Sequence, residues 1–170
     1  MTGLLSSLTQ IALLRKDPGN LPSSAASVAF FVLLFAATDL VLIWLDVNDH
    51  LIARTILDIA FALSFVGILL ALTGRMHRYA QTVIAIFGTD LLLTPAVIAL
   101  LLLRSPAKSN IAVALFSTAG TVLVVVWYLL IVGHILRSAL DTGLVTGFAI
   151  AVTWWFAAHA LSLAFFGAPP

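Results

Sequence analysis

Six ionisable side chains interrupt the long apolar stretches of this sequence, and their types allow proton exchange, ligand binding or metal ligation. They are Asp39, Arg54, Asp58, Asp90, His134 and His159. An Asp at the centre of a membrane-spanning helix costs about 2.5–3.5 kcal/mol on insertion scales. We therefore expect these groups to face other helices or water rather than lipid.

Five of these residues form a candidate intramembrane polar cluster: Asp39, Arg54, Asp58, Asp90 and His159. At the usual rise along a helix, Asp39, Asp58 and His159 lie roughly 9–12 Å from the same end of the bundle, which the charge distribution below makes the outer end. Asp90 falls near the middle of its helix. We expect these side chains to meet in one outward-facing polar pocket.

The cluster allows two interpretations. Arg54 and Asp58 are four residues apart, so they share a helical face and, in the simpler reading, form a structural ion pair. Asp39 and Asp90 have no partner in their own helices, and each needs an interhelical donor or a bound proton. These two acids either hold helices together or carry a proton or a ligand.

A metal or cofactor centre is not predicted. His134 and His159 lie toward opposite ends of the bundle, too far apart to share one cofactor. Asp39, Asp58, Asp90 and His159 have metal-binding chemistry, but no helix carries a Glu-x-x-His or His-Glu-x-x-His pattern. The sequence also lacks a nucleotide-binding loop and a Gly-x-Ser-x-Gly elbow, so no catalytic residue is identified and an enzyme is not expected.

Composition sets the class of protein. Hydrophobic residues make up 62% of the chain and charged residues 9%, whereas a soluble domain is about one quarter charged. A net charge of +1, with eight Lys and Arg spread along the chain, argues against binding to nucleic acid. The absence of cysteine excludes disulfides, thiolate nucleophiles and iron–sulfur clusters.

Apolar stretches of roughly 20 residues are long enough to cross a bilayer as helices. Short breaks containing Gly, Pro, Asn or Asp separate them. The sequence predicts an all-α integral membrane bundle of about five transmembrane helices, at Ala25–Leu45, Leu51–Leu72, Tyr79–Leu103, Ile111–Leu136 and Leu144–Phe166.

The first residues predict a short amphipathic helix in the membrane interface. Its apolar residues are Leu4, Leu5, Leu8, Ile11 and Ala12. Two prolines and a glycine within residues 17–22 end this helix. The chain is thus divided into an N-terminal segment and linker, 1–22, and a single transmembrane domain, 23–170. The segment does not read as a signal peptide, because its first charges follow the apolar residues.

Positive charge in the short loops predicts the orientation. With a cytoplasmic N-terminus, five basic residues lie inside: Arg15, Lys16, Arg75, Arg78 and Arg137. Arg104 and Lys108 lie outside, with Arg54 near the outer end of its helix. We expect the N-terminus to be cytoplasmic and the C-terminus to be outside.

Gly143, Gly147 and Ala151 form a ladder of small residues at a spacing of four. Such a ladder allows a helix to approach a neighbour closely, within the chain or in a homodimer. Apart from the lipid bilayer, the expected partners are other membrane proteins or a second copy bound through this ladder.

The phrase Leu14-Arg15-Lys16-Asp17-Pro18, with Leu21-Pro22 ahead of the first span, resembles the Yip1-domain superfamily, especially its small bacterial members. Gln81-Thr82 and Gly88-Thr89-Asp90 in the third span are similar to these proteins as well. The chain lacks the Asp-Leu-Tyr-Gly-Pro phrase of eukaryotic trafficking members, so a role in vesicle transport is not implied. The resemblance implies a bacterial inner-membrane scaffold or assembly partner without known catalytic residues.

Two functions from different classes follow. The first is a non-enzymatic scaffold or accessory subunit that acts through helix–helix contacts, because no loop is large enough to hold a site. The alternative is a small proton-linked transporter or channel that uses the intramembrane Asp residues. The lack of a visible internal repeat argues against the alternative.

Overall fold

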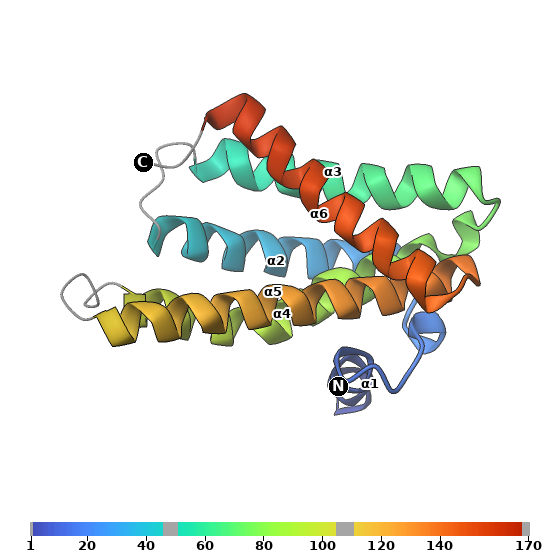
Figure 1. Ribbon diagram of the computed structural model, residues 1–170. Coiled ribbons are helices and arrows are strands. Elements are labelled where there is room, and N and C mark those ends of the chain that lie inside the picture. Colours follow the sequence, from blue (N-terminus) through green and yellow to red (C-terminus); the bar gives the residue numbers. More distant parts are fainter. Residues whose placement is uncertain (1, 46–50, 105–110, 168–170) are drawn as a thin grey trace.

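The computed structural model describes residues 2–45, 51–104 and 111–167, and every regular element in these ranges is helical (Figure 1). This confirms the all-α prediction. The long helices are α1 (Thr2–Ala12), α2 (Ala25–Leu45), α3 (Leu51–Leu72), α4 (Tyr79–Arg104), α5 (Ile111–Leu140) and α6 (Leu144–Phe166), and two short 3-10 turns are η1 (Pro18–Asn20) and η2 (Met76–Arg78). Lys108 and the side chain of Arg104, both used to predict orientation, lie outside the described residues.

Four helices are long and apolar enough to cross a membrane, so the chain is a multi-pass membrane protein. These spans are Ile52–Leu72, Met76–Leu103, Ile111–Leu140 and Leu144–Phe166. The described apolar part of α2, Ala25–Val41, is shorter. Large apolar side chains such as Leu33 and Leu123 point outward, as expected for surfaces that contact lipid.

Helices α2 to α5 run roughly along one common axis, α6 is inclined to them, and each helix runs in the opposite direction to the one before it (Figure 1). The turns that join α3 to α4 and α5 to α6 therefore lie at one end, together with the start of α2. We call this end the N-side end. The C-terminus of the described chain lies at the opposite end.

Helix α4 occupies the centre of the bundle and contacts α1, α2, α3 and α5. Its consecutive residues from Thr82 to Thr89 are all buried. Around them pack Leu70 of α3 and Ile131 and Ile135 of α5, which are fully inaccessible. Because lipid is as apolar as these side chains, close van der Waals packing is what holds this half of the bundle together.

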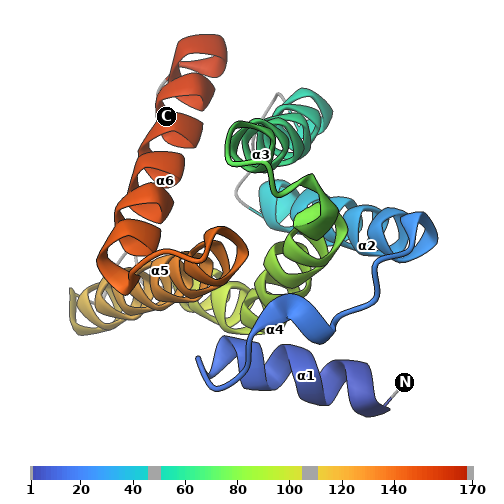
Figure 2. The same ribbon diagram turned by 90° about the vertical axis from the view of Figure 1, so that its right-hand side faces the viewer.

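The predicted N-terminal helix is present as α1, and it crosses the flank of the bundle roughly perpendicular to the other helices (Figure 2). Its Leu8 and Ile11 are 1% and 0% exposed. Gly88 of α4 makes this crossing possible, since a Cβ atom there would lie 2.8 Å from Cδ2 of Leu8. The bundle therefore covers Leu8, Ile11 and Ala12 of the apolar face of α1, whereas Leu5 remains 59% exposed.

The tightest contact between two helices joins α5 to α6 near the N-side end. A Cβ atom on Gly147 would collide with the carbonyl oxygen of Gly133 and lie 2.7 Å from Cβ of Arg137. Ala151 is also buried, whereas Gly143 has nothing near its missing Cβ. Two members of the small-residue ladder thus serve packing within the chain, and self-association through the ladder stays a prediction.

We expect Gly147→Ala to destabilise the protein by about 1–3 kcal/mol, because the added methyl group meets a backbone carbonyl that cannot move aside. Gly143→Ala is the matched control on the same ladder, since nothing lies within 4 Å of its added atom. Unfolding in mild detergent measures both. Equal losses of stability in the two variants would show that the crossing is not tight.

Candidate functional site

A partly open cavity of about 140 Å³ lies inside the bundle, lined by residues of α2, α3, α4, α5 and α6. Three residues of the predicted cluster line it: Asp58, Asp90 and His159. They come from three different helices that are distant in the sequence. The structure therefore brings together the residues that helical depth alone predicted to meet.

Asp39 does not line the cavity but lies close enough to interact electrostatically with both Asp58 and Asp90. The hydroxyl of Thr55 is next to it. Oδ2 of Asp39 and Oγ1 of Thr55 are both buried, and the two side chains interact between α2 and α3 without reaching full hydrogen-bond geometry. A buried polar atom without a partner costs free energy, so this pair stores unsatisfied hydrogen-bonding capacity beside the cavity.

Arg54 does not form the predicted ion pair with Asp58. The ion pairs among the described residues involve other side chains, and Arg54 affects Asp58 and Asp39 only through its longer-range charge. The physical reason is geometric: a shared helical face permits a pair at spacing four but does not require the long Arg side chain to reach it. Asp58 keeps its carboxylate toward the cavity instead.

Asp90 lies at the deepest part of the site. No described residue donates a hydrogen bond to its side chain, and the nearby hydroxyl of Thr94 bonds to the Asp90 backbone carbonyl instead, at 3.0 Å. Asp90 and Tyr128 also line a second cavity, of about 130 Å³, between α4 and α5. These two side chains thus separate two spaces within the bundle.

His159 completes the wall on α6. Its Nδ1 lies 3.1 Å from the carbonyl oxygen of Trp155, and its ring stacks on that of Trp155 at 4.1 Å between centroids. A proton on Nδ1 satisfies this carbonyl, which leaves Nε2 free to accept a proton or a ligand.

Aromatic side chains form most of the remaining wall, and none of them belongs to the predicted polar cluster. They are Phe35, Phe61, Phe87, Tyr128, Trp154 and Trp155. Trp154 packs at 6.4 Å from Phe61 and 5.3 Å from Phe65, measured between ring centroids. The signal that could have identified them is depth: Tyr and Trp in the middle of a span, away from the interfaces, are unusual.

His134 is remote from this site, as its position in the sequence predicted. It is buried against the N-terminal linker, and its Nε2 lies 3.2 Å from the carbonyl oxygen of Lys16. Among the described residues no group of three His, Cys, Asp or Glu side chains is placed to hold a metal ion.

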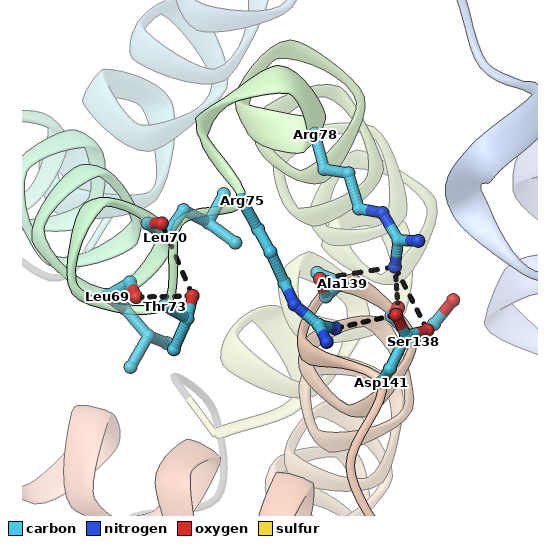
Figure 3. Close-up of polar contacts among 8 residues, drawn as sticks. All are labelled: Leu69, Leu70, Thr73, Arg75, Arg78, Ser138, Ala139 and Asp141. Atoms are coloured by element: carbon cyan, nitrogen blue, oxygen red, sulfur yellow. Dashed lines mark hydrogen bonds and ion pairs between the residues drawn. The ribbon is translucent and has the colours of Figure 1, made fainter.

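A second polar cluster, which the sequence did not predict, fastens the N-side end (Figure 3). Asp141, in the turn between α5 and α6, pairs with Arg75 at 2.7 Å and with Arg78 at 3.1 Å. Arg78 also donates to the carbonyl oxygen of Ser138 at 2.7 Å. We call these contacts the arginine clasp, because they tie the α3–α4 turn to the α5–α6 turn.

The arginine clasp also changes the pKa of Asp141, its acidic member. The hydrogen bond from Arg78, together with the charges of Arg75 and Arg78, holds the pKa of Asp141 below its ordinary value. Asp141 has a positive φ of 47°, a backbone conformation that Asp and Asn adopt more readily than most residues. Charge and turn geometry therefore both account for an acid at this position.

Comparisons with protein-family models, with curated proteins and with solved structures find no match for this chain. The resemblance to Yip1-domain proteins therefore stays a prediction.

We expect Asp141→Asn to lower the melting temperature at neutral pH, because it removes the charge that both arginines contact. Since the folded-state pKa is depressed, the wild-type advantage should be complete above the ordinary Asp pKa of about 3.9 and should shrink as the pH falls below it. Thermal unfolding across this pH range measures the effect. In an Arg78→Gln background the same substitution should cost less, and an undiminished cost would exclude the clasp as its cause.

Proposed function

We propose that this protein is a small proton-linked transporter or channel in which the intramembrane carboxylates exchange protons. The observation that carries the proposal is that Asp58 and Asp90 line one cavity, while Asp39, from a third helix, interacts electrostatically with both of them. Like charges at short range in a medium of low dielectric repel strongly. Such a group must bind protons or a cation, and it can release them again.

The surroundings of Asp90 support a role in transfer. Asp90 and Tyr128 border both cavities, so a proton on either side chain is within reach of two separate spaces. Toward the N-side end the bundle is closed by buried side chains of α3, α4 and α5, such as Leu70, Ile84 and Ile135. Transfer across the membrane therefore requires a movement of helices at this closed half.

The second candidate is the scaffold or accessory subunit, in a bacterial inner membrane, that the resemblance implies. Its support is the outward surface: large apolar side chains such as Phe116, Leu123 and Phe156 cover helix faces that a membrane partner could bind. In this case Asp39 and Asp90 would serve only to hold helices together.

The charge distribution supports an orientation for either function. Arg75 and Arg78 lie at the N-side end with Arg137 in the last turn of α5. Loops rich in Lys and Arg remain in the cytoplasm. We infer that the N-side end faces the cytoplasm and that the cavity opens toward the outer half of the membrane.

Reconstitution in liposomes tests the transport function. We expect wild-type protein to collapse an imposed pH gradient faster than empty liposomes, and Asp90→Asn to slow this flux at least about tenfold, because the amide cannot carry the proton. Asp17→Asn, an exposed acid remote from the cavity, is the control and should keep the wild-type rate.

Wild-type protein that adds no flux over empty liposomes would reject the transport function. If, in addition, the double variant Asp39→Asn/Asp90→Asn loses thermal stability, the acids hold the helices together and the scaffold is favoured. Flux that Asp90→Asn leaves unchanged would also exclude the proposed proton carrier.

A further inference from the structure

The cavity combines two features that together recognise one class of ligand: unpaired carboxylates and the faces of aromatic rings. Asp58 and Asp90 reach its surface, and the Asp90 side chain accepts no hydrogen bond from the described residues. Tyr128, Trp154 and Trp155 line the same space. Aromatic rings, Trp above all, attract a cation placed over their faces, and the attraction grows when water is excluded.

The excess of acidic over basic side chains around the cavity also favours the binding of a cation. Asp39 interacts with both Asp58 and Asp90, and Arg54 is the cationic side chain that interacts with Asp39 and Asp58. Arg54 forms no close ion pair with either. A bound cation would supply the missing positive charge inside a medium where unpaired charge is costly.

The size of the space selects among cations. About 140 Å³ is close to the about 150 Å³ of a cavity that accommodates benzene, and it exceeds what a bare metal ion fills. The described residues also offer no set of three carboxylate or imidazole groups placed to ligate a metal. A compact organic cation with apolar substituents matches both the volume and the mostly aromatic wall.

We infer that this cavity binds the head of an organic ammonium ion, of about the size of a trimethylammonium group, between Trp155 and the carboxylates of Asp58 and Asp90. The inference rests on the proposed function, because the same carboxylates would exchange a proton for the cation. Such a head occurs in free quaternary amines and in choline lipids, which carry the same chemistry.

Binding of choline to the purified protein in phosphatidylglycerol nanodiscs, followed by isothermal titration calorimetry, tests the inference without any transport measurement. The neutral isostere dimethylbutanol, in which carbon replaces the ammonium nitrogen, is the matched ligand control. We expect choline to bind and the isostere not to bind. Equal affinity for both compounds, or no binding of choline, would overturn the inference.

Substitutions of residues that line the cavity test whether choline binds there. Asp90→Asn should weaken choline binding at least about tenfold, because a buried charge loses its partner. Trp155→Leu should weaken it about three- to tenfold and Trp155→Phe less, since Phe keeps an aromatic face. Trp127→Leu is the control, because Trp127 is 38% exposed on α5 and does not line the cavity. Unchanged affinity in Trp155→Leu, with its fold intact, would overturn the inference even if Asp90→Asn failed to fold.

A second set of nanodiscs made from phosphatidylcholine separates the two sources of the cation. Weaker binding of free choline in these discs would mean that the lipid head group occupies the same site, and unchanged binding would assign the site to the free amine. Binding without proton flux would keep this inference and reject the transport function, whereas flux without binding would do the reverse.

Discussion

The high cost of exposing a carboxylate to lipid is the constraint from which the interior of this protein follows. Each of α2, α3 and α4 carries one Asp within its apolar stretch. All three helices must therefore turn that side inward, and doing so fixes their rotation about their own axes. The acids meet because each of them avoids lipid, and aromatic side chains of α2 to α6 line the rest of the shared space.

The bundle differs along its length as a consequence. At the N-side end, Gly133 and Gly147 bring two backbones together, and Gly88 admits Leu8 of α1. The arginine clasp then joins the two turns at this end. Toward the other end α6 diverges from α5 (Figure 1), and the cavity lies between these two helices and α2, α3 and α4. The tightly packed half at the N-side end stabilises the rest of the bundle. The other half carries unpaired polar groups, whose burial is not favoured by packing alone.

The helices could be predicted from the sequence because a membrane span depends on local composition. Four of the five predicted spans start and end within one residue of the helices in the structure. The remaining span, α5, continues to Leu140, whereas the prediction ended it at Leu136. The meeting of Asp58, Asp90 and His159 was predictable from depth alone. The arginine clasp was not, because Arg78 and Asp141 are 63 residues apart and depend on how two turns pack. The spacing of four residues also predicted an ion pair between Arg54 and Asp58, which the folded protein does not form.

The two candidate functions make opposite demands on the same acids. If the acids only held helices together, each carboxylate would be expected to accept a hydrogen bond from a neighbouring helix. A buried carboxylate without such a donor destabilises the helix interface. Oδ2 of Asp39 lies beside the Thr55 hydroxyl of α3 without reaching full hydrogen-bond geometry, and Asp90 faces open space on two sides. Unpaired acids next to a cavity are costly for a static scaffold but are required of a site that must take up and release a charge. This asymmetry is the physical reason to favour exchange over a purely structural role.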